Sequence, residues 1–245
     1  MSAQAYFDAA AAGLEKLRDE QLANIEAAAE LLADTIQAGK AIFAFGASHS
    51  FMLPMELVYR TGSLMLINPI YPHGMDLTVR PLAMTSQIER IPDYGRVLLE
   101  NSPARAGDAL LIASTSGRNA VVIDMAIAAQ EQDIKTVGIT SVEYSTSVPS
   151  RHPSGKRLLD FCDLVIDNCA PLGDAAVEVP GVEQKTGPLS TVLGVAVVNA
   201  IACQTIAHLV ERGIDPPIYI SANMPGGDEH NARLLAENAE RIHYM

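Results

Sequence analysis

The sequence predicts an α/β fold of three layers, with a five-stranded parallel sheet between two layers of helices. Five short apolar runs have the length and composition of buried strands, and helical patterns separate most of them. The 245 residues are 49% hydrophobic and 19% charged, which supplies enough apolar surface for a substantial core. Short strands that alternate with helices are typical of a parallel sheet covered on both faces. Such sheets bind ligands beyond the carboxyl ends of their strands, so we expect a ligand site at that edge.

The first 38 residues are expected to form a helical arm ahead of the sheet. Residues 2–38 are rich in Ala, Leu, Glu and Gln, contain no proline, and place apolar residues at helical spacing. This pattern predicts one or two long helices that end at Gly39. Such an arm caps the domain or pairs with another subunit, and a packing element without chemistry is the favoured interpretation. Residues 39–245 are expected to form one ligand-binding domain that includes a C-terminal helix.

The remaining elements follow from apolar runs and the turn residues between them. The expected strands cover residues 41–45, 64–67, 109–113, 136–140 and 164–167. The expected helices cover residues 51–59, pieces of 83–99, 120–130, 156–161, 189–209 and 228–242. Asp228 is the expected N-cap of the last helix, because it follows a double-glycine break. Residues 141–155 hold two prolines and are expected to form a surface loop, and residues 170–187 are expected to be irregular.

Composition argues against several classes of function. The formal net charge of -12 disfavours a nucleic-acid partner, because binding a phosphate backbone needs a basic face. The three cysteines show no CxxC spacing, so neither a disulfide framework nor a zinc site is indicated, and a cytoplasmic location is expected. The N-terminus has no basic region ahead of an apolar run, so no signal peptide is expected. No apolar stretch is expected to reach transmembrane length, since polar residues interrupt the most apolar segment, 192–206.

Two of the expected strands end in hydroxyl-rich loops that precede helices. The first loop is Gly46-Ala47-Ser48-His49-Ser50, and the second is Ser114-Thr115-Ser116-Gly117-Arg118-Asn119. Ordinary turn and capping chemistry explains either loop alone. At the same end of one sheet the two loops would share a polar pocket, to which a helix N-terminus adds unpaired N–H donors and partial positive charge. The pair therefore favours an anion site, and the phosphate of a sugar phosphate is the expected anion.

A dinucleotide site is the obvious rival, and the sequence does not support it. That site needs a G-x-G-x-x-G turn after the first strand and an acidic residue near the end of the second strand, to hold the ribose. The first loop has only Gly46, and the second expected strand ends in Ile67-Asn68 without a carboxylate. A Walker-type phosphate loop is excluded as well, because no Gly-Lys-Ser/Thr sequence is present.

The two loops resemble those of the SIS (sugar isomerase) domain family. In that family the first loop is of the G-x-G-x-S kind and the second is of the S-x-S-G-x-[ST/N] kind. The matching residues are Gly46 and Ser50 in the first loop, and Ser114, Ser116, Gly117 and Asn119 in the second. Ser48 departs from the pattern, because it stands where a glycine is usual. The stretches 150–156, 167–168 and 227–231 are similar to those of a stand-alone SIS subgroup, and the resemblance covers roughly residues 38–243.

The resemblance implies a flavodoxin-like sheet and a phosphosugar ligand, with no metal or organic cofactor. It also implies that the two loops bind the ligand and its phosphate, through Ser48, Ser50, Ser114, Thr115, Ser116, Gly117 and Asn119. Dimers and tetramers are common in the family, so a homodimer or homotetramer is expected. The family includes isomerases, an etherase, sugar-sensing regulators and synthase domains, so the reaction itself stays open.

Three residues are candidates for the chemistry. Glu56 lies six residues after Ser50 among apolar neighbours, where a carboxylate suits general-base work, and SIS isomerases use a glutamate at the matching place to move a proton between C1 and C2. The alternative for Glu56 is an ion pair with Arg60 on a solvated face. His49 lies in the first loop. His230 begins the C-terminal helix, and in several SIS proteins a histidine from this region opens the sugar ring, sometimes across a subunit boundary.

These candidates favour a phosphosugar isomerase that works through an enediolate. A lyase that cleaves an ether on a sugar phosphate is the second interpretation, because it would use the same base for elimination. The third is a non-catalytic sugar-phosphate sensor, which is less favoured because no DNA-binding module or basic face is evident.

Overall fold

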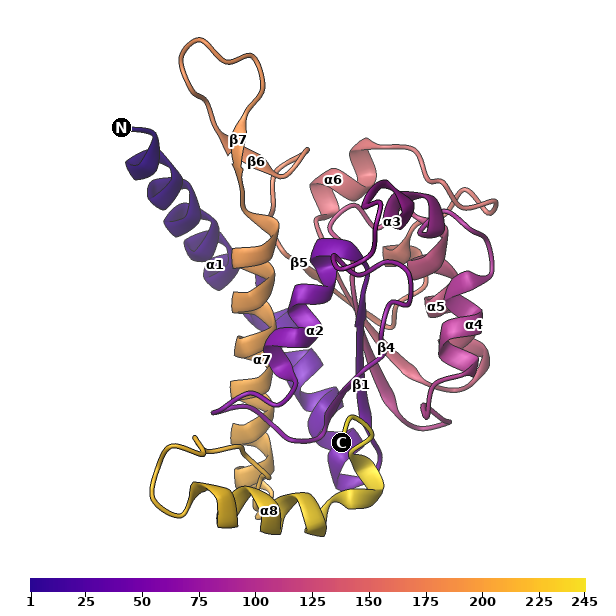
Figure 1. The fold of residues 1–245 in the computed structure, drawn as a ribbon, viewed down its shortest axis with the longest axis vertical. Helices are drawn as coiled ribbons and strands as arrows, with labels where there is room; N and C mark the ends of the chain where they lie inside the picture. The colour runs from indigo at the N-terminus through magenta and orange to yellow at the C-terminus, as the bar shows by residue number, and fades with distance from the viewer.

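The computed structural model describes residues 1–245 and shows a five-stranded parallel sheet between two layers of helices (Figure 1). The strands of the sheet are β1 (Ile42–Gly46), β2 (Ile67–Pro69), β3 (Ala109–Ala113), β4 (Lys135–Thr140) and β5 (Leu164–Asp167). The α-helices are α1 (Ser2–Gln37), α2 (Met52–Leu57), α3 (Ala83–Ile88), α4 (Tyr94–Glu100), α5 (Ala120–Glu131), α6 (Val142–Ser147), α7 (Ser190–Glu211) and α8 (Gly227–Glu237). Short 3₁₀ turns cover Ser48–Phe51, Leu158–Asp160 and Ala239–Arg241. The predicted fold class is confirmed.

The order of the strands brings the two hydroxyl-rich loops together. The sheet has the flavodoxin-like order β2-β1-β3-β4-β5, with every neighbouring pair parallel. The order reverses between β1 and β3, where Gly46 at the end of one strand pairs with Ala113 at the end of the other. The loops that follow these two residues therefore emerge side by side at the carboxyl edge of the sheet.

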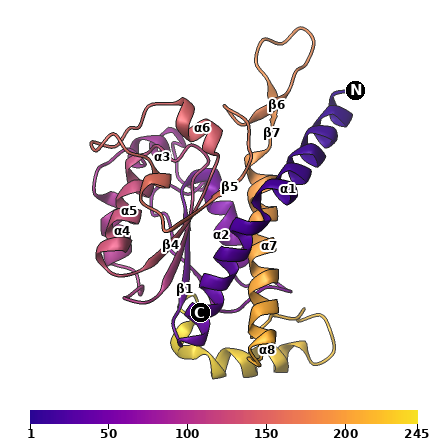
Figure 2. The same cartoon turned by 180° about the vertical axis from the view of Figure 1, so that it is seen from behind.

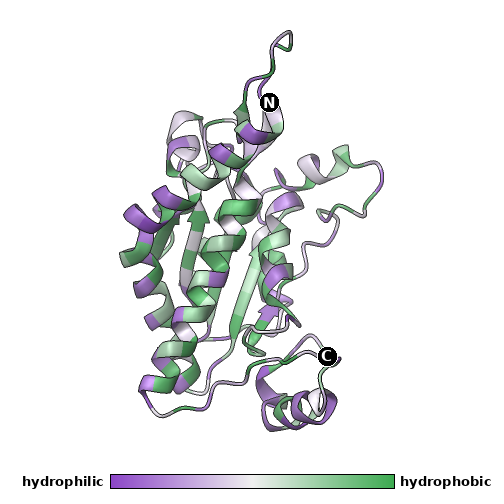
Figure 3. Cartoon of the chain, turned by 90° about the vertical axis from the view of Figure 1, so that its left-hand side faces the viewer, coloured by the Kyte–Doolittle hydropathy of each residue, from purple (hydrophilic) through white to green (hydrophobic).

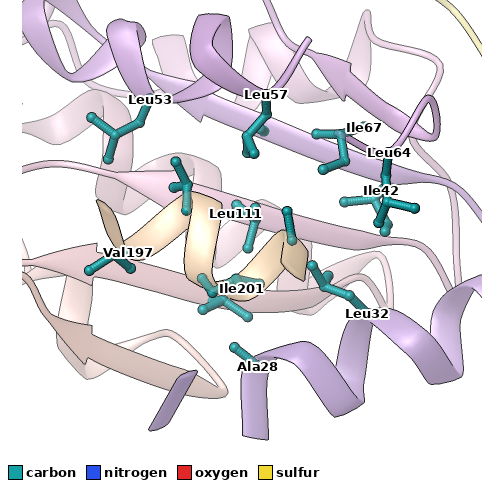
Figure 4. Close-up of a cluster of buried hydrophobic side chains, with 14 of the residues drawn as sticks. Ala28, Leu32, Ile42, Leu53, Leu57, Leu64, Ile67, Leu111, Val197 and Ile201 are labelled. Atoms are coloured by element: carbon teal, nitrogen blue, oxygen red, sulfur yellow. The ribbon is translucent and has the colours of Figure 1, made fainter. Parts of the chain in front are cut away.

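Helices cover both faces of the sheet. α1, α2 and α7 lie on one face, and α4 and α5 lie on the other (Figures 1 and 2). The strands are mostly apolar, whereas the surrounding helices also carry hydrophilic residues (Figure 3). On the first face, side chains from α1, α7 and β3 meet in one buried cluster that includes Leu32, Val197, Ile201 and Leu111 (Figure 4). Burial of each such side chain contributes about 1.5–3 kcal/mol, so this layer holds the sheet and the two long helices together.

α1 is a single helix of 36 residues rather than two helices. It ends before Gly39, as predicted, where the backbone turns with a φ of 72°. The N-terminal end of α1 extends past the sheet in the same direction as an antiparallel hairpin of β6 (Ala175–Val177) and β7 (Thr186–Pro188) (Figures 1 and 2). The Tyr6 hydroxyl donates a hydrogen bond of 3.1 Å to the carbonyl of Pro188, which ties the arm to the hairpin.

α7 is long and apolar enough to cross a membrane by length and composition alone. The expectation that no stretch reaches that length was therefore wrong. In the structure, Leu193, Val197 and Ile201 of this helix are buried in the core. Packing against α1 and the sheet accounts for the apolar character of that side of the helix.

Two stretches that were expected to be irregular contain regular structure. α6 lies within residues 141–155, and the Ser141 hydroxyl caps it by accepting a hydrogen bond of 3.1 Å from the Tyr144 N–H. The hairpin of β6 and β7 lies mostly within residues 170–187. The two prolines of residues 141–155 follow Ser147, so they exclude a helix only from the second half of that stretch.

Several predicted boundaries also differ from those of the structure. β2 begins at Ile67, because Leu64 pairs instead with Ile218 in an isolated antiparallel bridge. α2 ends at Leu57, two residues before Tyr59, whose left-handed backbone (φ 50°) does not continue a helix. Gly226, with a φ of 76°, occupies the N-cap position of α8, so Asp228 lies in the first turn and does not cap the helix.

Candidate functional site

The first hydroxyl-rich loop turns sharply at the end of β1. A Cβ atom on Gly46 would lie 2.4 Å from the carbonyl oxygen of Ser50, so only glycine fits at this position. Ser48 has a φ of 52°, a left-handed backbone that glycine adopts more readily than other residues. The Ser48 N–H donates to the Met75 carbonyl at 2.8 Å, which helps to hold this conformation. Ser48 therefore adopts the backbone conformation of the glycine that is usual at this position, and it adds a hydroxyl to the loop.

The second hydroxyl-rich loop connects β3 to α5. Gly117 has a φ of 56°, and its N–H donates to the hydroxyl oxygen of Ser114 at 3.2 Å, which closes a tight turn. The Thr115 carbonyl accepts a hydrogen bond of 3.0 Å from the Ser141 N–H, so the loop is fixed to the end of β4. Asn119 occupies the N-cap position of α5 with an extended backbone, but its side chain makes no capping hydrogen bond.

Both loops line one cavity of about 280 Å³ at the carboxyl edge of the sheet. The loop residues in its lining with hydroxyl, amide or imidazole side chains are Ser48, His49, Ser50, Ser114, Thr115, Ser116 and Asn119. An adjoining recess is lined by Ser190 and Thr191, at the first turn of α7. The N-termini of α5 and α7 therefore both border this space, and that of α5, which no side chain caps, adds partial positive charge and N–H donors.

A carboxylate lies between the two loops. The Ser48 hydroxyl donates to Glu89 Oε1 at 2.5 Å, and the Asn119 amide donates to Glu89 Oε2 at 2.6 Å. The Glu89 carbonyl accepts a hydrogen bond of 3.1 Å from the N–H of Val121, in the first turn of α5. Sequence reasoning missed Glu89, because its contacts with both loops are tertiary and no local pattern marks it.

The second carboxylate in the cavity lining, that of Asp174, accepts hydrogen bonds from the first residues of α7. Asp174 Oδ1 accepts hydrogen bonds from the N–H groups of Leu189 (3.0 Å) and Ser190 (2.6 Å), and Oδ2 accepts one from the Ser190 hydroxyl (2.7 Å). Asp174 therefore acts as the helix cap that α7 otherwise lacks. The hydroxyls of Ser190 and Thr191 were also missed, although two hydroxyl residues at the start of a long apolar helix were a signal that sequence reasoning had available.

Comparison with known proteins decides the family. The SIS domain family matches residues 5–141 of the chain. The UPF0309 protein of Shouchella clausii is 42% identical over 240 residues, which is 98% of each chain. The UPF0309 protein of Streptomyces coelicolor is 43% identical over 240 residues, which is 98% of this chain and 96% of the other. The chain is a SIS-domain protein of the UPF0309 family.

Solved structures with the same fold include two phosphoheptose isomerases. The enzyme from Francisella tularensis aligns with this UPF0309 protein at a TM-score of 0.55 and 11% identity, over 83% of this chain and 95% of that one. The enzyme from Neisseria gonorrhoeae aligns at a TM-score of 0.53 and 18% identity, over 84% of this chain and 97% of that one. At these identities the likeness shows the fold alone. The UPF0309 protein therefore resembles phosphosugar isomerases in structure.

The UPF0309 chain does not bring every predicted residue to the cavity. Glu56 forms an ion pair with Arg60 at 3.2 Å and accepts a hydrogen bond of 3.3 Å from the Asn199 amide, so it adopts the alternative arrangement that its spacing allowed. His230 lies on α8, near the other end of α7 from the cavity, with Nε2 3.2 Å from the Ile218 carbonyl oxygen (Figure 1). Within one chain His230 is remote from the loops, so a role in the site requires a second subunit. The catalytic roles of Glu56, His49 and His230 stay predictions.

The loop that follows α6 brings a cation beside the second hydroxyl-rich loop. Arg151 Nη1 donates to Asn119 Oδ1 at 3.0 Å, and the Arg151 N–H donates to the Arg118 carbonyl at 2.9 Å. Burial lowers the pKa of Arg151, and the neighbouring Arg118 guanidinium lowers it further. A buried pair fixes this loop to α5, since His152 Nε2 lies 2.9 Å from Asp124 Oδ1.

Proposed function

We propose that this UPF0309 protein binds a sugar phosphate between its two hydroxyl-rich loops and interconverts the aldose and ketose forms through an enediolate. The observation that carries the proposal is that both loops, from neighbouring strands, line one cavity that also holds the Glu89 carboxylate. The structural likeness to phosphoheptose isomerases supports the same class of ligand.

Three serine hydroxyls of the two loops are assigned to the phosphate. Ser50, Ser114 and Ser116 supply hydroxyl donors in the cavity, and the N-terminus of α5 adds backbone donors. A hydrogen bond to a charged group contributes about 1.5–3 kcal/mol, so a few of them anchor a phosphate without a cation in direct contact. Binding at the phosphate would then orient the reacting carbons of the sugar.

Glu89 is assigned the proton transfer. Isomerisation needs a base that removes a proton from one carbon and returns it to the next, so its carboxylate must reach the sugar. Glu89 lines the cavity, whereas Glu56 is paired with Arg60 outside that lining. Hydrogen bonds from Ser48 and Asn119 hold the Glu89 carboxylate in place. His49 is assigned to ring opening, because its imidazole lines the same cavity.

A homodimer or homotetramer is proposed as the working form. Phe7, Leu14 and Leu22 on α1 are 67%, 40% and 57% exposed, and their spacing of seven and eight residues places them on one side of the helix. Packing of a second copy against this arm would bury them. A neighbouring subunit is also the source from which a His230 side chain would reach the cavity.

Deuterium exchange tests the proposed reaction. Hexose, heptose and amino-sugar phosphates are incubated with the protein in deuterated water, and proton NMR follows C1 and C2. Enzyme-dependent incorporation at C1 or C2 together with the isomeric product is expected. An ether-substituted sugar phosphate is incubated in the same way, and loss of its ether substituent would favour the lyase. Saturable binding without exchange or product would favour the sensor.

A further inference from the structure

A second cavity, of about 480 Å³, lies at the opposite edge of the sheet from the candidate site. Its lining comes from the residues that lead into β1, those that lead into β3, and the C-terminal segment: Lys40, Arg105, Asp108, Glu240, Arg241 and His243. It therefore lies at the amino ends of the two strands whose carboxyl ends carry the hydroxyl-rich loops. The five residues of β1 separate the two regions by about 17 Å of extended chain.

The cavity gathers cations that have no carboxylate partner. Lys40, Arg105 and Arg241 take part in none of the ion pairs within 4.0 Å. The Lys40 ammonium donates to the Ala106 carbonyl at 2.9 Å, and the Arg241 guanidinium donates to the Ile36 carbonyl at 3.3 Å. In a chain with a net charge of -12, these three cations outnumber the two carboxylates of the lining, Asp108 and Glu240, and make the cavity a local site for an anion.

Buried side chains fix the segments that carry these cations. Asp108, 3% exposed, accepts the N–H of Ala41 at 2.9 Å and the N–H of Arg105 at 2.8 Å, so backbone donors satisfy both oxygens of its carboxylate. Asn68, 1% exposed, donates to the Arg241 carbonyl at 2.9 Å and accepts the N–H of His243 at 2.7 Å. These hydrogen bonds hold chain segments that are far apart in the sequence around one cavity, so its cationic side chains start from a fixed backbone.

His243 joins this cavity to a second, more apolar one of about 350 Å³. The His243 ring stacks on the buried ring of Phe43, with centroids 5.8 Å apart and planes at 11°. Tyr71 and Tyr94 are among the residues that line the apolar cavity. A single ligand could therefore place a charged group in the cationic cavity and an organic group in the apolar cavity.

We infer that the cationic cavity binds a small molecule that carries two or more phosphate charges, at a site separate from the candidate active site. Guanidinium groups bind phosphate oxygens through pairs of N–H donors, and an ammonium adds a compact charge. Free pyrophosphate and a nucleoside diphosphate share this chemistry. If the ligand is a nucleoside diphosphate, the apolar cavity beyond His243 would hold its nucleoside.

Titration calorimetry on the full chain tests this site, with sodium pyrophosphate and ADP as separate probes. Saturable binding of at least one probe is expected, and it should weaken as sodium chloride is added. The double variant Lys40→Ala/Arg105→Ala should bind that probe at least about tenfold more weakly, because it loses two charge-assisted contacts. Tighter binding of ADP than of pyrophosphate would show that the adenosine part of ADP contributes to the affinity.

The matched control is Lys16→Ala/Lys185→Ala, which removes the same charge from exposed ion pairs elsewhere and should leave binding unchanged. Ser116→Ala, in the candidate active site, should also leave it unchanged. Absence of binding by both probes overturns the inference, as does an equal loss in the two double variants or a loss in Ser116→Ala. If circular dichroism shows that the first double variant is misfolded, Arg105→Gln should show the weakening by itself. None of these results depends on whether the protein is an isomerase.

Discussion

The hydroxyl of Ser48 donates a hydrogen bond of 2.5 Å to the carboxylate of Glu89, a residue 41 positions further along the chain. Asn119 donates to the other carboxylate oxygen, so Glu89 contacts both hydroxyl-rich loops at once. This places an acidic group and a set of hydroxyl donors in the lining of one cavity. The proposed function depends on that arrangement, because anchoring and proton transfer then occur on the same bound sugar.

Glu89→Gln is expected to lower the rate of isomerisation by at least about 100-fold, since the amide cannot accept the proton. Sugar-phosphate binding should change much less, because Glu89 is not assigned to the phosphate. Turnover and calorimetric titration on the same preparation measure the two effects. Glu56→Gln is the matched comparison and should keep most of the activity. If Glu56→Gln lowered the rate of isomerisation more than Glu89→Gln did, Glu56 would be the base.

Ser114→Ala and Ser116→Ala should each weaken sugar-phosphate binding by about tenfold or more, because each removes one hydrogen bond to a charged group. The binding of the same sugar without its phosphate should be unaffected. Ser86→Ala, on the exposed surface of α3, is the control and should bind normally. Equal losses for phosphorylated and unphosphorylated sugars would show that these hydroxyls do not contact the phosphate.

Asp124→Ala should lower the free energy of unfolding by about 1–3 kcal/mol, because it removes the buried acceptor of two part-buried hydrogen bonds. Asp124 accepts the N–H of Asp93 at 2.7 Å, and its other oxygen lies 2.9 Å from His152 Nε2. Glu131→Ala, on the same helix, removes only an exposed ion pair with Arg96 and should cost less than about 1 kcal/mol. Urea unfolding measures both. Similar losses would mean that the His152 loop is not held by Asp124.

The thiol of Cys162 should be unreactive in the folded protein at neutral pH. Burial raises the pKa of the Cys162 thiol from its ordinary value of 9.0 to about 12, so very little of the thiolate that reacts with disulfide reagents is present. A thiol with a raised pKa stabilises the fold below pH 9.0, and this contribution is lost as the pH rises from 9.0 toward 12. Labelling followed by mass spectrometry should find exposed Cys203 modified well before Cys162. Rapid native labelling of Cys162 would contradict this picture.

The fold was predictable because its signals are local. Runs such as 41–45 and 109–113 are apolar over strand length, and each is followed by turn residues and a helix start. The helix 120–130 and the arm ending at Gly39 were recognised for the same reason. The elements that were missed have weak local signals. α6 depends on a single capping hydroxyl at Ser141, and β6 and β7 have only three residues each.

The candidate site was predictable only in part, for a related reason. The two loops were found because their hydroxyls are consecutive in the sequence and follow strands. Glu89, Asp174 and Arg151 reach the loop region through tertiary contacts, which spacing along the chain does not encode. Conversely, the spacing of Glu56 from Ser50 suggested proximity, but the side chain pairs with Arg60.

A crystal structure with the tightest-binding sugar phosphate tests the central claim most directly. Phosphate oxygens are expected within about 3 Å of the hydroxyls of Ser114 and Ser116. The sugar carbons should then lie toward the Glu89 carboxylate. A phosphate seated instead among Lys40, Arg105 and Arg241, with the space between the two loops empty, would contradict it.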